Sequence, residues 1–103
     1  MLDFDALDGF EWDDGNGRKN EKHGVSRQEA EQVFFNQPLV LLEDPRHSGG
    51  EPRFHLLGKT NEDRLLHITF TLRGSGGTKI RVISARSMSG KEKIVYGQAT
   101  ESP

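Results

Sequence analysis

The chain of 103 residues contains no cysteine and no long hydrophobic run. The absence of cysteine excludes disulfide bonds and thiolate metal sites, and it is compatible with the cytosol. No stretch approaches the roughly 20 apolar residues that a membrane-spanning helix requires. Hydrophobic residues make up only 32% of the sequence and aromatic residues 8%. We therefore expect one domain with a thin core, and a partner is one way to cover its remaining apolar surface.

Charge is distributed unevenly, although the formal net charge is only −2. Residues 1–14 hold six acidic side chains and no basic one, where a secretory signal would be basic. Residues 73–93 hold six basic side chains and a single acid, Glu92. A local basic patch can bind phosphate even when the whole protein is acidic. The alternative is that both segments are solvated surfaces, and charge alone does not decide between the two.

The first part of the chain predicts a short strand and two helices. Residues 10–12 favour the strand, and residues 14–23 favour a helix that its glycines weaken. Ser26 and Glu29 have the spacing of a capping box, so a second helix is expected to begin there. The helix is expected to end near residue 36, ahead of Pro38.

The remainder predicts a sheet and one more helix. Four strands are expected, at residues 39–43, 52–58, 64–73 and 79–85. Their short connections favour an antiparallel meander, and residues 74–77 form a glycine-rich hairpin connection. Ser89 and Glu92 repeat the capping-box spacing and predict a last helix. Residues 98–103 are expected to be a flexible tail.

Lys22-His23-Gly24 is the first candidate site. Histidine exchanges protons near neutral pH, and the adjacent lysine can neutralise a phosphate. The backbone N–H groups of the helix that begins after Ser26 can also bind an anion. The alternative is structural: Gly24 ends a helix in the left-handed conformation, and Lys22 and His23 interact favourably with the negative end of the helix dipole.

The second candidate site combines Glu51 and Arg53 with the arginines of the predicted sheet. Guanidinium groups hold phosphate bidentately and stabilise the charge of a transition state. The arginines concerned are Arg53, Arg64, Arg73, Arg81 and Arg86. His55 shares a face with Arg53, and His67 lies near them if the strand register permits. Alternatively, these residues form ordinary surface pairs or protect sheet edges.

Two aromatic residues can stack on a base, although each is more typical of a packed core. They are Trp12 and Tyr96. Established metal, nucleotide and hydrolase motifs are missing from the sequence. Any chemistry is therefore expected to need neither a metal nor another cofactor.

The sequence resembles the BrnT family, the toxin half of a bacterial toxin–antitoxin pair, over about residues 10–96. The matching residues are Phe10-Glu11-Trp12-Asp13, Gly15-Asn16, Lys22 to Ser26, Glu29 to Phe34, Asp44, His47-Ser48, Glu51-x-Arg53, Gly58, Arg64, Thr71, Arg73, Arg81 to Arg86, Met88, Glu92 and Tyr96. Ser89-Gly90 departs from the more basic residues usual there. The resemblance implies a single toxin domain at residues 10–97, after an acidic extension at residues 1–9.

The resemblance also implies an α+β fold and a function. The fold is RelE-like, a small antiparallel sheet packed by two N-terminal helices and one C-terminal helix. The activity is that of a cytoplasmic endoribonuclease that slows growth by cutting RNA. The partner is a BrnA-like ribbon-helix-helix antitoxin in a heterotetramer, which contacts operator DNA only through the antitoxin. No membrane is involved.

The mechanism implied by the resemblance is attack of the RNA 2′-OH on the adjacent phosphorus. Under this hypothesis His23 transfers a proton, and Glu51 orients an arginine or acts as base. Arg53, Arg64 and Arg86 would hold the scissile phosphate. The residues expected to bind RNA are Lys22, Arg73, Arg81 and Tyr96. Two alternatives stay open: a catalytically inactive domain that binds antitoxin or RNA, and a stand-alone dimer.

Overall fold

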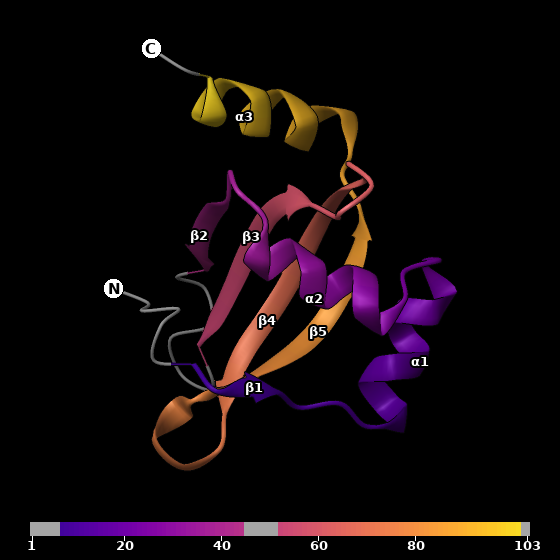
Figure 1. The fold of residues 1–103 in the computed structure, drawn as a ribbon, viewed down its shortest axis with the longest axis vertical. Helices are drawn as coiled ribbons and strands as arrows, with labels where there is room; N and C mark the ends of the chain where they lie inside the picture. Colours follow the sequence, from indigo (N-terminus) through magenta and orange to yellow (C-terminus); the bar gives the residue numbers. More distant parts are fainter. Residues whose placement is uncertain (1–6, 45–51, 102–103) are drawn as a thin grey trace.

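Five strands form one sheet in the order β1-β5-β4-β3-β2, with three α-helices around it (Figure 1). The computed structural model describes residues 7–44 and 52–101. The strands are β1 (Gly9–Phe10), β2 (Val40–Asp44), β3 (Arg53–Lys59), β4 (Leu65–Arg73) and β5 (Lys79–Ser87). The helices are α1 (Asp14–Lys22), α2 (Arg27–Phe35) and α3 (Gly90–Thr100). The predicted α+β class and element order are confirmed.

The sheet is mixed rather than purely antiparallel. Strands β2 to β5 form the predicted meander, with every neighbouring pair antiparallel. The short strand β1 pairs in parallel with β5, and Phe10 lies beside Ile80. The backbone N–H of Glu11 extends this pairing by donating to the carbonyl of Ile80 at 2.8 Å. Strand β1 thus covers an edge of β5 that would otherwise present unpaired backbone groups.

Helix α2 covers one face of the sheet, as its sequence pattern predicts (Figure 1). Ser26 caps the helix, and both hydrogen bonds of the capping box with Glu29 are present. Its buried side chains meet the alternating apolar residues of β4 and β5 in one core. That core includes Ala30, Val33, Phe34, Leu66, Ile68, Phe70 and Val82. We call the side of the sheet that carries this core the helix-covered face.

Helix α1 forms despite its two glycines because Asp13 and Asn16 anchor its first turn. Each accepts a hydrogen bond from the backbone N–H of the other, at 3.1 and 2.7 Å. The buried Asn16 side chain also donates to the backbone carbonyls of Glu11 and Val82, both at 3.1 Å. These bonds fasten the start of α1 to β5, so tertiary contacts outweigh the poor helix propensity of glycine.

Helix α3 lies near one end of the sheet (Figure 1). It packs on the face opposite to α2, because it meets Leu57, which alternates with the core residue Leu56. Tyr96 and Met88 meet Leu57 in a second, smaller apolar cluster. The helix continues to Thr100, so it includes residues 98–100 of the predicted flexible tail. We call this side of the sheet the open face, because α2 contributes to the main core on the other side.

The pairing of β4 with β5 contains an irregularity that decides where Arg86 points. Thr69 pairs with Ser84, whereas the next residue, Phe70, pairs with Val82. Residue 83 is therefore extra, as in a β-bulge. Beyond it the alternation of β5 is reversed, so Ala85 is buried in the core. Arg86 consequently lies opposite His67 on the open face.

Candidate active site on the open face of the sheet

Five charged or titratable side chains meet on the open face, and we call them the open-face network. Asp44 Oδ2 lies 3.3 Å from Nε2 of His55. Nδ1 of His55 lies 2.9 Å from Nε2 of His67, whose own Nδ1 lies 2.7 Å from Oε2 of Glu92. Arg86 donates to both oxygens of Glu92, at 2.8 and 2.9 Å. The network thus joins β2, β3, β4, β5 and α3.

Glu92 is held in place by the start of its own helix. It is the third residue of α3, and its side chain accepts a hydrogen bond from the backbone N–H of Ser89 at 2.9 Å. The same carboxylate accepts hydrogen bonds from the guanidinium of Arg86 and contacts Nδ1 of His67. A capping residue therefore doubles as the anchor of the network, which makes its position precise.

Electrostatic interactions shift the ionisation of three network members. The hydrogen bonds from Arg86 lower the pKa of Glu92 from its ordinary 4.5 to about 2. The same bonds raise the pKa of Arg86. Burial lowers the pKa of His67, and Arg86 acts in the same direction, while Glu92 opposes both. Glu92 and Arg86 are thus an ion pair at neutral pH, beside an imidazole that is disposed to be neutral.

A cavity of about 320 Å³ opens directly onto the network. Its lining consists of Leu42, His55, Leu57, His67, Lys91, Glu92 and Val95. Apolar walls with a few convergent titratable groups are typical of a ligand or reaction site. Arg86 is 39% exposed beside it, so a phosphate can reach the guanidinium.

The turn between α1 and α2 forms a separate polar group. Gly24 has a φ of +70°, as the helix-ending interpretation of Lys22-His23-Gly24 predicts. Arg64 donates to the Gly24 carbonyl at 2.8 Å and pairs with Glu29 at 3.1 Å. His23 is exposed in this turn and lies outside the open-face network. Arg64 thus lies at the turn that carries Lys22 and His23, and it also reaches Ser87, the neighbour of Arg86, at 3.3 Å.

The acidic and basic blocks of the sequence neutralise each other. Arg81 pairs with Asp13 at 2.9 Å and with Glu11 at 3.1 Å. Arg73 lies 4.0 Å from the same Glu11 carboxylate. Part of the basic block is therefore occupied by acids of the N-terminal segment, which leaves a smaller basic surface than the sequence suggests.

One comparison with known proteins decides the family. A family model described as "ribonuclease toxin, BrnT, of type II toxin–antitoxin system" matches residues 12–92. The chain belongs to the BrnT family. Membership implies a ribonuclease toxin with an RNA substrate and an antitoxin partner. A search of curated proteins gave no match.

In this BrnT chain the expected site residues divide between several places. Arg86 lies in the open-face network, and Arg53 lies at the start of β3, exposed and paired in register with Asp44. Glu51 and His47 lie outside the described residues. The structure therefore brings Arg53 and Arg86 to the same face of the sheet but does not join them to His23.

Tyr96, expected from the sequence to contact RNA, packs inside this BrnT chain. Its side chain is buried, and its hydroxyl donates to the backbone carbonyl of Pro38 at 2.8 Å. Burial also raises the pKa of the phenol. The ring ties α3 to the segment before β2, so it has no free face for a base. Trp12 is likewise packed against the core, as expected.

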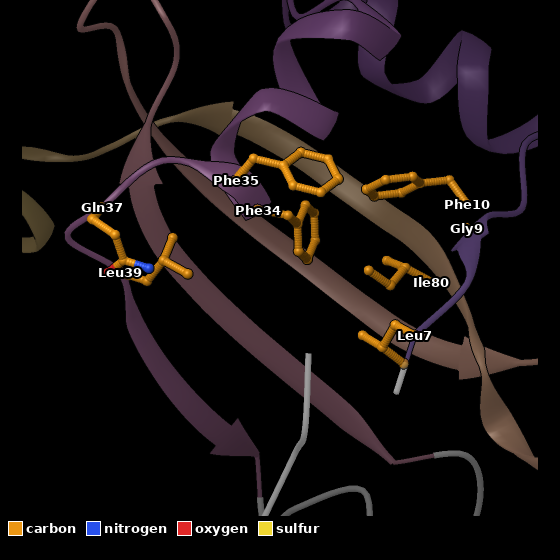
Figure 2. Close-up of a pocket in the computed structure, with 8 residues that line it drawn as sticks. All are labelled: Leu7, Gly9, Phe10, Phe34, Phe35, Gln37, Leu39 and Ile80. Carbon is orange, nitrogen blue, oxygen red and sulfur yellow. The ribbon is translucent and has the colours of Figure 1, made fainter. Parts of the chain in front are cut away.

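A second cavity, of about 300 Å³, lies on the helix-covered face between β1 and α2 (Figure 2). The rings of Phe10, Phe34 and Phe35 stand close together in its lining, with Leu7 and Ile80 below them in the view (Figure 2). Its lining contains no titratable side chain. This cavity therefore offers no side chain for acid–base chemistry.

Sequence reasoning did not assign Asp44 or Glu92 to the site. Both belong to the segments that resemble the family, and His55 and His67 were expected on one face. The capping box disclosed the position of Glu92, but its contact with His67 spans 25 residues. Only the docking of α3 on the sheet brings that carboxylate to the imidazole.

Proposed function

We propose that this protein is a metal-independent endoribonuclease toxin whose reaction centre is the open-face network. The observation that carries the proposal is the fork of Arg86 on Glu92 beside His67, because Glu92 and His67 line a cavity on the open side of the sheet. An exposed guanidinium next to a titratable imidazole can hold a phosphate and move a proton in one place.

The reaction we propose is attack of the RNA 2′-OH on the adjacent phosphorus, giving a 2′,3′-cyclic phosphate and a free 5′-OH. Arg86 stabilises the charge that develops on the phosphoryl oxygens. Its guanidinium has five N–H donors, and its contacts are two with Glu92, one with the carbonyl of Ser87 and one with Nδ1 of His67. Positioning and charge stabilisation supply much of the rate in such a site.

We also propose a path for the rest of the RNA. Lys22, His23 and Arg64 bind the flanking backbone at one end of β4 and β5, because Arg64 reaches Ser87, the neighbour of Arg86, at 3.3 Å. Arg73 and Arg81 bind it towards the other end of these strands. Arg53 contributes from the start of β3, with Glu51 as its expected partner. The role of proton transfer, expected of His23, is assigned instead to the open-face network.

The proposed partner is a BrnA-like antitoxin, in a cytoplasmic heterotetramer that contacts operator DNA only through the antitoxin. Large apolar side chains remain exposed near the site: Leu42 at 46%, Val95 at 40% and Ile94 at 62%. Leu42 and Val95 also line the cavity. An antitoxin segment bound to this patch would block access to the open-face network. The exposed patch therefore supports inhibition of the toxin by an antitoxin that covers the site.

The alternative is a catalytically inactive domain that binds antitoxin or RNA. One observation favours it: the members of the network already satisfy one another by hydrogen bonds. The test is incubation of the purified chain with RNA in EDTA, followed by analysis of the fragment ends. Cyclic phosphate and 5′-hydroxyl ends support the proposal. Intact RNA, together with unaffected growth of cells that express the chain, refutes it.

A further inference from the structure

The two histidines of the network lie in a row of three short contacts that must share protons. The row runs from Asp44 to His55 at 3.3 Å, to His67 at 2.9 Å and to Glu92 at 2.7 Å. Each contact joins two atoms that both accept when unprotonated, so each needs one proton. Ionised carboxylates supply none, and two neutral imidazoles supply two. Filling all three contacts therefore requires one additional ring proton.

Every arrangement with two ring protons leaves one of the three contacts without a proton, and the Thr69 hydroxyl, 3.1 Å from Nδ1 of His55, can donate to that nitrogen if the gap lies between the rings. The gap at Glu92 is the one that conflicts with the geometry. Arg86 Nη2 lies 2.8 Å from Nδ1 of His67 and can donate to it if that nitrogen is unprotonated. The lone pair of the same nitrogen would then face Oε2 of Glu92 at 2.7 Å without a proton between them. Because the pKa of Glu92 is about 2, that oxygen carries negative charge at neutral pH. The two acceptors would repel each other, so the three-proton arrangement is favoured.

We propose that His55 and His67 form a coupled acid–base pair, which holds three ring protons between Asp44 and Glu92 and donates one to the leaving oxygen during RNA cleavage. This inference rests on the proposed ribonuclease function and names the acid of that reaction. The 2′-oxygen forms a bond to phosphorus, and its proton passes to water. The bond from phosphorus to O5′ breaks, its electron pair stays on O5′, and the pair protonates that oxygen. Solvent then returns one proton to the pair.

The surroundings of the pair suit a proton that is held firmly and yet can be released. Carboxylates face it from β2 and α3, and they favour the charged form. Arg86 from β5 and Lys91 from α3 favour release. The side chains of His55 and His67 are 25% and 14% exposed, and both line the cavity. Both imidazole rings can therefore be reached from that cavity.

Coupling makes the pair titrate as a unit, with an apparent pKa that belongs to both rings. Above that pKa the acid form is lost, so cleavage should fall on the alkaline side of its pH profile. Asp44→Asn keeps an oxygen acceptor but removes one negative charge, and should move this limb down by about one pH unit. A purely structural role for Asp44 would lower the melting temperature without moving the limb.

The proton count can be measured without RNA, by ¹⁵N NMR of the imidazole nitrogens of the full chain. His55→Gln and His67→Gln assign the signals among the four histidines. We expect three ring protons in the pair at pH 7. One proton on each ring would overturn the proposal, whether or not the protein cuts RNA.

The role as acid is tested by the pH profile of cleavage for wild type, Asp44→Asn and the control Glu43→Gln. Glu43 is the exposed neighbour on β2 and alternates to the other side of the strand. A shifted limb in Asp44→Asn alone supports the proposal. An unmoved limb with three protons present overturns the role as acid. Three protons with intact RNA and unaffected growth of cells that express wild type would instead refute the proposed ribonuclease function, and the acid role with it.

Discussion

Replacing Arg86 by alanine removes the group that the proposed mechanism needs most. The guanidinium is the network's exposed cation and stands beside both His67 and the cavity. Removal of one preorganised donor that stabilises transition-state charge typically costs about 10²–10³ in kcat, roughly 2.7–4 kcal/mol. We therefore expect Arg86→Ala to cleave RNA about 100- to 1,000-fold more slowly at saturating RNA.

The same substitution also affects stability, so the assay must separate the two effects. Arg86→Ala removes two hydrogen bonds to the Glu92 carboxylate. Hydrogen bonds to charged groups contribute about 1.5–3 kcal/mol. Because Arg86 is 39% exposed and therefore screened, about 1–2 kcal/mol is a fairer figure. That corresponds to a fall in melting temperature of roughly 4–16 °C for a domain of this size.

Gly58→Ala provides a control of matched stability. A Cβ at Gly58 would lie 2.8 Å from Cγ1 of Val33, on the helix-covered face. Such overpacking costs about 1–3 kcal/mol without touching the open-face network. Cleavage is measured for both variants at a temperature where circular dichroism shows them folded. Equal losses of activity in Gly58→Ala and Arg86→Ala would refute the catalytic assignment of Arg86.

Three further predictions concern stability and RNA binding. The lowered pKa of Glu92 contributes stability that is fully present above about pH 4.5 and is lost as the pH falls through 2. In denaturant titrations, the free energy of unfolding should therefore differ more between pH 6 and pH 3 for wild type than for Glu92→Gln. Tyr96→Phe loses the bond from its hydroxyl to a backbone carbonyl, and its free energy of unfolding should fall by about 1 kcal/mol. The double variant Glu11→Gln/Asp13→Asn frees Arg81, and should bind RNA more tightly and with a steeper salt dependence.

Local physical chemistry accounts for the elements that the sequence predicts well. The capping boxes at Ser26 and Ser89 place the starts of α2 and α3, because they depend on residues three apart. Alternation along residues 65–70 identifies β4 and the side that it buries, and Thr71 is buried beyond it. Helix α1 was predicted weakly, since its anchor is the bond from Asn16 to Val82, 66 residues away.

The candidate site depends on features that no local pattern encodes. Without the extra residue in β5, strict alternation from Val82 would turn Arg86 towards the helix-covered face. The pairing of Arg81 with Glu11 spans 70 residues and requires β1 to lie beside β5. These are properties of strand register and helix docking. Strand register and helix docking, rather than composition, decide which of the several arginines contacts a histidine.

The most direct test of the account compares histidines in the two places where the structure puts them. Cleavage of RNA in EDTA is measured at saturating RNA for wild type, His67→Gln and His23→Ala. Loss of a proton-transfer group typically costs 10²- to 10⁴-fold, so we expect His67→Gln to be at least about 100-fold slower. His23→Ala, at the turn between α1 and α2, should lose less than about tenfold. The reverse order would contradict the assignment of the reaction centre to the open face.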